Sequence, residues 1–193
     1  MTHEIIISGF GGQGVMALGK TIAEAGMKEG LCVSWMPSYG PEMRGGTANC
    51  SVVLSEDEII SPMVLNPTEL IVMNKPSLVK FEPQLASGGT LFVNSSIIEI
   101  KASRKDVTAY YIPCLDIANE LGSAKVANMV MLGAYMEATG LLRPDTVREI
   151  FLHLFTGAKA ALVELNVEAL RRGAKRLSEE ATHAYPNLKN RIA

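Results

Sequence analysis

The sequence has no excess of positive charge, no long hydrophobic run and no leader pattern. Its 193 residues include 18 Lys and Arg against 20 Asp and Glu, a net charge of −2. Without a basic field a protein does not attract a phosphate backbone, so nucleic-acid binding is disfavoured. The longest apolar segment, residues 126–138, contains Asn128 and Glu137 and falls short of the ~20 residues of a membrane-spanning helix. The opening MTHEIII lacks the basic region and cleavage site of a signal peptide. We expect a cytoplasmic protein without a membrane span.

Cysteine is scarce as well. Cys32, Cys50 and Cys114 are an odd number, lie far apart and belong to no CxxC pair or Cys/His cluster. This spacing predicts reduced, structural thiols and no metal site, and it argues against an iron–sulfur cluster ligated within the chain. Aromatic residues make up only 6% of a sequence that is 48% hydrophobic. The core is therefore expected to be aliphatic, and so apolar a chain favours a surface that meets a partner.

Hydrophobic patterning predicts a single α/β domain over residues 1–182. Residues 4–8 are a continuous apolar run followed by glycines, which is typical of a buried parallel strand, and residues 13–29 have the spacing of an amphipathic helix. With a strand at 31–35 they form a βαβ unit. Further strands are expected at 47–55 and 58–62, which would pair as a hairpin, and at 69–73, 88–96 and 107–113; further helices are expected at 77–85, 117–122, 125–139, 144–155 and 158–181. The fold class is α/β, a three-layer Rossmann-like domain with a mixed, mostly parallel sheet, and residues 183–193 form a polar C-terminal tail.

A glycine-rich turn, GFGGQG at residues 9–14, joins the first strand to the first helix. Its G-x-G-x-x-G spacing lets a ligand approach the backbone closely, at a helix N-terminus that presents free N–H groups. We predict that Gly9, Gly11, Gly12, Gln13 and Gly14 bind a phosphate group. The alternative is a tight packing turn without a ligand, although such a turn has no need of the amide of Gln13.

Two nucleotide-binding patterns overlap this turn, and neither fits fully. A dinucleotide-binding domain has an acidic residue at the end of its second strand, about 20 residues on, to hold the ribose. Here that strand ends in VSWMPS, with no Asp or Glu. Residues 14–21, GVMALGKT, match the P-loop pattern, but they start inside the helix instead of directly after a strand. A free-standing NAD(P)-binding oxidoreductase and a P-loop NTPase stay open as alternatives.

The loop after the second strand, PSYGPEMRGG at residues 37–46, has unusual chemistry for a connection. Arg44 offers a planar fork for a carboxylate or phosphate, Glu42 is placed to orient it, and Tyr39 supplies a flat amphipathic surface. The alternative is a solvated loop in which Glu42 and Arg44 pair with each other. Because turns at the carboxyl ends of parallel strands share one edge of the sheet, we expect this loop and the glycine turn to face the same space.

Taken together, the two motifs GFGGQG and PSYGPEMRGG resemble the gamma subunit of the 2-oxoacid:ferredoxin (or acceptor) oxidoreductases. The segment PSYGPEMRGGTANC is most similar to the 2-oxoglutarate branch of this family. The segment NMVMLGA at residues 128–134 also falls where that family has a similar one. The resemblance covers nearly the whole chain.

The resemblance implies a division of labour among subunits. Such complexes decarboxylate a 2-oxoacid on thiamine diphosphate with Mg²⁺, pass electrons through iron–sulfur clusters to ferredoxin or another acceptor, and form an acyl-CoA. Alpha and beta subunits hold the thiamine diphosphate, and the clusters belong to the beta subunit and a ferredoxin-like subunit. The gamma subunit packs on these partners, close to the catalytic centre and the expected path of CoA. We predict that this chain has no catalytic residue and is not active alone, and that residues 9–14 and 37–46 form one edge that docks on the partners and helps to hold CoA. The implied interface edge consists of Tyr39, Gly40, Pro41, Glu42, Met43, Arg44, Gly45, Gly46 and Asn128.

Overall fold

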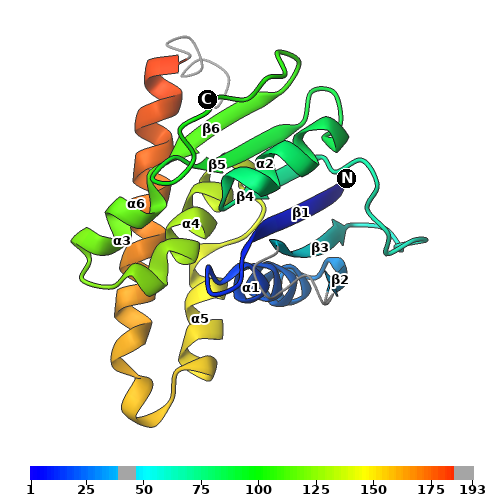
Figure 1. Ribbon diagram of the computed structural model, residues 1–193. Helices are drawn as coiled ribbons and strands as arrows, with labels where there is room; N and C mark the ends of the chain where they lie inside the picture. The colour runs from blue at the N-terminus through cyan, green and yellow to red at the C-terminus, as the bar shows by residue number, and fades with distance from the viewer. Residues whose placement is uncertain (39–46, 185–193) are drawn as a thin grey trace.

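A six-stranded sheet forms the centre of the computed structural model, which describes residues 1–38 and 47–184 (Figure 1). The strands are β1 (Thr2–Phe10), β2 (Cys32–Ser38), β3 (Thr47–Ser55), β4 (Glu69–Val72), β5 (Thr90–Asn94) and β6 (Thr108–Ile112). The helices are α1 (Val15–Lys28), α2 (Lys75–Phe81), α3 (Cys114–Glu120), α4 (Ala127–Thr139), α5 (Pro144–Leu154) and α6 (Ala161–Ala184), with short 3-10 turns η2 (Glu82–Gln84), η3 (Ala124–Val126) and η4 (Gly157–Lys159).

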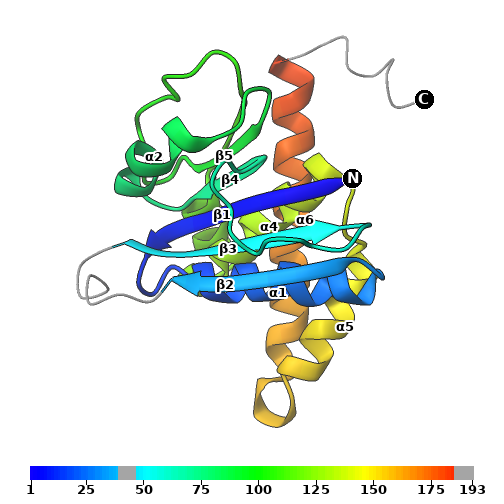
Figure 2. The ribbon, with the colours of Figure 1, turned by 90° about the vertical axis from the view of Figure 1, so that its right-hand side faces the viewer.

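The sheet is mixed and mostly parallel, as predicted. Its strand order is β2-β3-β1-β4-β5-β6. Strand β3 runs antiparallel to both β1 and β2, and the pairs β1–β4, β4–β5 and β5–β6 are parallel. Figure 2 shows β3 lying between β1 and β2. The predicted hairpin of residues 47–55 with 58–62 is wrong, because 58–62 form no strand and both sides of β3 are already paired. The first βαβ unit is thus widened by an inserted antiparallel strand.

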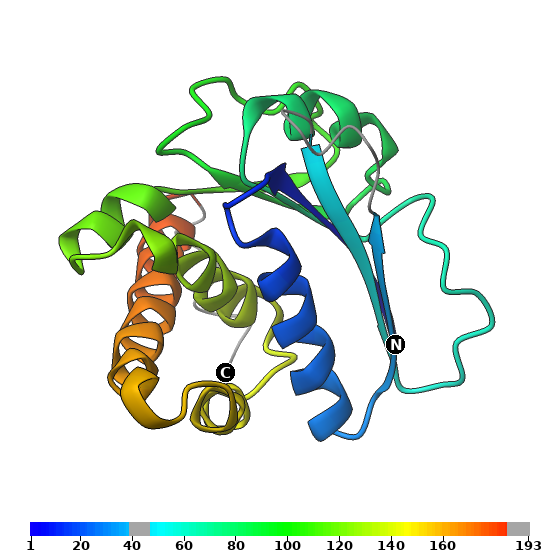
Figure 3. The same ribbon diagram turned by 60° about the horizontal axis from the view of Figure 1, so that its bottom comes forward.

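Helices cover the two faces of the sheet unequally. Successive strand residues point to opposite faces, so Ile5 and Ile7 join a large apolar core with α1 and α3 to α6, while Ile6 joins a smaller core with α2. In Figure 3, α2 (green-blue) lies on one side of the sheet, and α1 (blue) and α6 (orange) lie on the other. The predicted three-layer architecture is confirmed.

Helix α4 crosses α6 at very short range. It is buried continuously from Asn128 to Met136, as its all-round apolar pattern predicts. A Cβ atom on Gly133 of α4 would overlap the backbone of Leu170, and one on Gly173 of α6 would overlap the backbone of Val130. Only glycine allows this approach, so the backbones of α4 and α6 are in direct contact where the two helices cross. Among the described residues, no helix is both long and apolar enough to cross a membrane.

Glu29 joins the end of α1 to the start of α5. Its carboxylate accepts hydrogen bonds from the Arg143 side chain (Nε, 2.7 Å), from the Arg143 backbone N–H at 3.3 Å and from the Thr146 hydroxyl. The Thr146 bond, followed by those from Arg143, lowers the pKa of Glu29 below its usual range. A carboxyl group whose pKa is lowered by folding stabilises the protein when it is ionised, and this contribution is lost as the pH falls through the lowered pKa.

We predict that Glu29→Gln lowers the melting temperature at pH 7 by about 2–4 °C, the equivalent of ~1 kcal/mol of lost hydrogen bonding. The difference from the unchanged protein should shrink once the pH falls below the ordinary pKa of Glu, about 4, because the charge of Glu29 is lost as the pH passes through its lowered pKa. Thermal unfolding across this pH range measures the effect. Glu24→Gln on the same helix, which loses only a surface contact to Lys20, is the control and should show little pH-dependent difference. Equal pH profiles for the two variants would contradict the role of Glu29.

Candidate ligand-binding site

The carboxyl ends of β1, β4, β5 and β6 lie side by side at one edge of the sheet, because these strands are parallel neighbours. After β1 the chain enters α1 on one face, and after β4 it enters α2 on the opposite face (Figures 1 and 3). The connections therefore diverge between two adjacent strands. A crevice at such a point is the usual ligand site of an open α/β sheet.

The glycine turn at residues 9–14 sits at this divergence. Gly12 and Gly14 have φ angles of 91° and 73°, which other residues rarely adopt. Gly9 is needed for a different reason, since a Cβ there would lie 2.8 Å from the Cβ of Met73. Gly11 and Gly12 are exposed and have open space around them. Their backbone is the part of the turn that a ligand can reach.

Gln13 holds the turn closed. Its backbone N–H donates to the Phe10 carbonyl at 3.2 Å. Its side chain bridges two strand ends, because Oε1 accepts from the Phe10 N–H at 2.6 Å and Nε2 donates to the Met73 carbonyl at 2.9 Å. The polar groups of Gln13 are therefore engaged inside the protein, and Gln13 positions the turn while Gly11 and Gly12 face outward.

Asn128 lies against the opposite side of the turn. It belongs to the first turn of α4, is 6% exposed, and donates from Nδ2 to the Gly14 carbonyl at 3.2 Å. A Cβ on Gly14 would come within 2.5 Å of that Nδ2. The structure thus brings Asn128 together with the glycine turn, across 114 residues of sequence.

The loop predicted to share this edge falls outside the described residues. It comprises Tyr39, Gly40, Pro41, Glu42, Met43, Arg44, Gly45 and Gly46. The residues on either side of it are placed, and Thr47 pairs with Phe10, the last residue of β1, while Ser38 pairs with Asn49. Both flanks of the loop therefore stand at the edge that contains the glycine turn.

Beside the turn a cavity of about 250 Å³ opens at the same edge. Its walls come from the ends of four neighbouring strands and from the start of α4. The lining residues are Gly12 and Gln13 after β1, Met73 after β4, Asn94 and Ile97 at the end of β5, Leu115 after β6, and Ala124, Lys125 and Ala127.

The surroundings of this cavity favour a negatively charged group. Helix α1 has no side-chain cap at its N-terminus, so its first N–H groups keep their partial positive charge, whereas the first N–H of α4 donates to the Ala124 carbonyl of η3. Lys125 adds an exposed ammonium group, and none of the lining residues is acidic. Cys114, next to the lining residue Leu115, is fully buried, and burial raises the pKa of its thiol so that it stays neutral.

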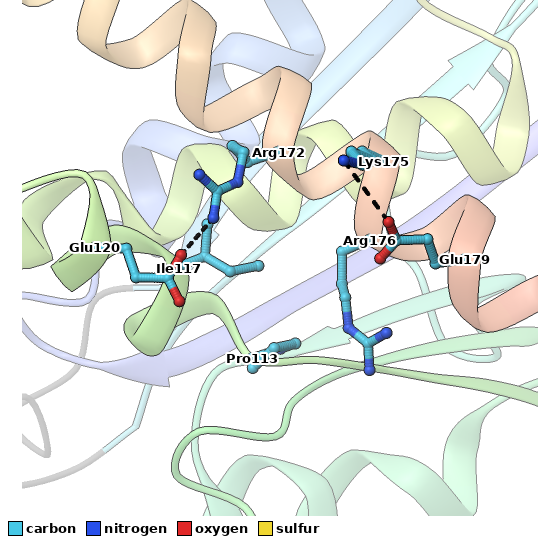
Figure 4. Close-up of a pocket in the computed structure, with 7 residues that line it drawn as sticks. All are labelled: Pro113, Ile117, Glu120, Arg172, Lys175, Arg176 and Glu179. Atoms are coloured by element: carbon cyan, nitrogen blue, oxygen red, sulfur yellow. Dashed lines mark hydrogen bonds and ion pairs between the residues drawn. The ribbon is translucent and has the colours of Figure 1, made fainter.

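A second hollow, of about 280 Å³, lies beyond α3, where α3 faces α6 (Figure 4). Arg172 pairs with Glu120, and Lys175 lies 3.9 Å from Glu179, so two of its three cations already have acidic partners. Figure 4 shows Arg176 extending between these pairs toward Pro113. Because most of its charge is compensated within the protein, this hollow is a weaker anion site than the cavity beside the glycine turn.

Sequence reasoning missed most of the cavity lining. Met73 and Asn94 each follow an apolar run that was predicted to be a strand. Because ligand sites of open α/β sheets lie at the carboxyl ends of the strands, the same rule could have predicted these two residues as part of the lining. Lys125 has no such signal, because its position depends on how η3 and α4 pack beneath the sheet edge.

The P-loop pattern has an ordinary helical explanation. Lys20 is exposed on α1 and lies 3.4 Å from Glu24, and the Thr21 hydroxyl donates to the Ala17 carbonyl at 2.8 Å. Neither residue is among those that line the cavity. The sequence prediction that this match lies inside a helix is confirmed.

The mixed sheet with helices on both faces defines a Rossmann-like α/β domain, a class that serves many functions. The chain belongs to the pyruvate ferredoxin/flavodoxin oxidoreductase family, whose model matches residues 4–176. It is 42% identical over 171 residues to the ketoisovalerate oxidoreductase subunit VorA of Methanothermobacter thermautotrophicus, covering 88% of this chain and 35% of VorA. It is 35% identical over 186 residues to the 2-oxoglutarate synthase subunit KorC of Methanothermobacter marburgensis, covering 93% of this chain and 98% of KorC.

Two solved structures share the fold. The gamma subunit of a keto/oxoacid ferredoxin oxidoreductase from Geobacter sulfurreducens superposes with a TM-score of 0.78 at 28% identity, covering 92% of this chain and 99% of that one. A 2-oxoglutarate:ferredoxin oxidoreductase from Magnetococcus marinus, solved with 2-oxoglutarate, coenzyme A and succinyl-CoA bound, gives 0.85 at 24% identity over 92% of this chain and 31% of that one. The chain spans about a third of VorA and nearly all of KorC. Within the family the chain is similar over almost its whole length to KorC and to the Geobacter gamma subunit, and a free-standing NAD(P)-binding oxidoreductase is not favoured.

We predict that Gln13→Leu lowers the free energy of unfolding by about 1–3 kcal/mol, because the buried Met73 carbonyl and the Phe10 N–H both lose their partner. Urea denaturation measures the loss. Gln84→Leu is the matched control, since Gln84 makes a single exposed bond to the Lys80 carbonyl, and its change should stay within about 0.5 kcal/mol. Equal losses for the two variants would show that the Gln13 bridge does not support the turn.

Proposed function

We propose that this chain is a non-catalytic subunit of a cytoplasmic, multi-subunit 2-oxoglutarate:ferredoxin (or acceptor) oxidoreductase and is not active alone. The complex would convert its 2-oxoacid to an acyl-CoA with loss of carbon dioxide. The match to nearly the whole of KorC and the sequence of the segment PSYGPEMRGG support 2-oxoglutarate as the substrate. The higher identity to VorA favours ketoisovalerate as the second candidate.

The observation that carries this proposal is the chemistry of the cavity beside the glycine turn. Its lining offers backbone groups, two amides, apolar walls and one ionisable side chain, Lys125. General acid–base or nucleophilic catalysis needs paired groups within hydrogen-bonding reach, such as a nucleophile and its base. A lining of this kind holds and orients a ligand, and the chemistry is assigned to the partners.

Thiamine diphosphate, Mg²⁺ and the iron–sulfur clusters are accordingly assigned to the partner subunits. Thiamine diphosphate supplies carbanion stabilisation when it is bound. Within the described ranges of this chain, no group of three His, Cys, Asp or Glu side chains is arranged to hold a metal ion. Burial raises the pKa of Cys50 to about 11 and that of Cys114 further, which disfavours the thiolate form that ligates clusters. The donor groups in the described part of the chain therefore do not fit a cluster.

CoA is the ligand that we assign to this edge. The exposed backbone of Gly11 and Gly12, at the uncapped N-terminus of α1, is suited to a phosphate group of CoA. Gly9, Gln13 and Gly14 shape the turn that presents this backbone. Arg44 and its neighbours from Tyr39 to Gly46 are assigned to the interface with the alpha and beta subunits, where Arg44 binds a phosphate or the carboxylate on the substrate side.

We predict that a tagged chain, purified from cells of its own source, copurifies with subunits that contain thiamine diphosphate and iron–sulfur clusters. Mass spectrometry, thiamine analysis and iron analysis identify them. Recovery of the chain alone under mild conditions would overturn the subunit assignment.

With the purified complex, kcat/KM should be higher for 2-oxoglutarate than for ketoisovalerate, and the reverse order would select the second candidate.

We predict that Arg44→Ala in the assembled complex raises the KM for CoA or weakens subunit assembly by about tenfold, as expected for loss of a charge-assisted hydrogen bond. Steady-state kinetics and size-exclusion chromatography measure the two effects. Lys105→Ala, which also removes one positive charge but lies before β6 at the opposite edge of the sheet, is the control. If Arg44→Ala and Lys105→Ala behave alike, the role assigned to the loop is wrong.

A further inference from the structure

Charge is distributed unevenly along the chain. Residues 169–193 contain six Lys and Arg against two Asp and Glu, although the whole chain has a net charge of −2. The first 168 residues therefore carry a net charge of −6. Four of the six cations lie on α6, at Arg171, Arg172, Lys175 and Arg176. A basic surface on a protein of opposite overall charge is suited to an acidic partner.

Arg176 differs from the other three cations in having no partner within the protein. No hydrogen bond or ion pair joins its guanidinium to any side chain that the structure describes. The other cations each lie beside a glutamate, in the pairs Arg171–Glu168, Arg172–Glu120 and Lys175–Glu179. Arg176 is therefore the uncompensated positive charge of this part of α6.

The guanidinium of Arg176 extends into the hollow of about 280 Å³ between α3 and α6 (Figure 4). The side chain is half-buried, so part of the water that would otherwise satisfy its five N–H donors is excluded. Pro113 and Ile117, which is 7% exposed, give the hollow an apolar side. The hollow thus combines a planar donor group with an apolar surface, a combination frequent at the energetic centres of protein interfaces.

The charges around Arg176 favour a single carboxylate over a phosphate. Figure 4 shows Glu120 and Glu179 on either side of the guanidinium, and their carboxylates repel a group of higher negative charge. A carboxylate carries one charge and matches the guanidinium fork with two parallel hydrogen bonds. One exposed ion pair is too weak to retain a small free acid, whereas an Asp or Glu of a protein is held in place by the contacts around it.

We propose that the hollow between α3 and α6 is a docking site for an acidic segment of a partner subunit, and that Arg176 binds an Asp or Glu carboxylate of that segment. The assignment rests on the proposed function, which supplies the partner subunits. The hollow lies beyond β6, whereas the 39–46 loop follows β2 at the other end of the strand order. The subunit would therefore be held at two separate places.

The test measures the dissociation constant of this chain from its purified partner subunits. Arg176→Ala should raise the dissociation constant about tenfold, and Arg176→Glu about a hundredfold, because the second change adds repulsion. Added salt should weaken binding of the unchanged chain more steeply than that of Arg176→Ala. Arg171→Ala is the matched control, since it removes the same charge from the same helix but loses a partner inside the protein, Glu168. It should change the dissociation constant by less than about twofold.

Crosslinking identifies the partner directly. Arg176→Lys keeps the charge without the fork, so it should bind better than Arg176→Ala and less well than the unchanged chain. A carbodiimide then joins the new amine to a carboxylate in direct contact, and mass spectrometry of the complex should find residue 176 linked to an Asp or Glu of a partner subunit.

Three results would overturn the docking site. Arg176→Ala and Arg171→Ala might bind equally well, or residue 176 of the Arg176→Lys chain might crosslink to no partner subunit. Alternatively, Arg176→Ala might raise the KM for the 2-oxoacid with unchanged subunit affinity, and the hollow would then hold a small free carboxylate. If the unchanged chain does not bind thiamine- or cluster-containing subunits at all, the proposed function itself fails.

Discussion

The bridge that Gln13 makes between the ends of β1 and β4 is the interaction on which the candidate site depends. One amide accepts from the Phe10 N–H and donates to the Met73 carbonyl, so the glycine turn is fixed to the neighbouring strand instead of projecting freely. The turn then starts α1 on one face at the point where β4 leads into α2 on the other. With these groups engaged, the open backbone left to a ligand is that of Gly11 and Gly12.

Two long-range packing choices complete the edge around that bridge. The antiparallel strand β3 lies between β1 and β2, which brings both flanks of the 39–46 loop to the edge of the glycine turn. On the helical side, Gly133 and Gly173 let α4 and α6 approach closely. The start of α4 carries Asn128 onto the turn and Ala127 into the cavity wall. The site is therefore assembled from strand ends and one helix start that are distant in sequence.

Elements with strong local patterns were predictable. The apolar runs in β1, β4 and β5, the all-round apolar α4 and the glycine turn between strand and helix all lie where the sequence places them. The hairpin at 58–62 was predicted wrongly, because the pairing partner of β3 is chosen by the whole sheet and not by the nearest segment in sequence. Asn94 was overlooked for a similar reason, because only the packing of the strand ends places this residue in the lining of the cavity.

The sequence by itself determined the class of fold, the position of the glycine turn, the absence of an acidic residue at the end of the second strand, and a resemblance to a family to which the chain belongs. Only the tertiary structure decided that β3 separates β1 from β2 and that the side chain of Gln13 bridges the ends of β1 and β4. The physical reason is one of range. Hydrophobic periodicity and glycine conformations act over a few residues, whereas strand order and hydrogen-bond satisfaction depend on contacts between segments that are far apart in sequence.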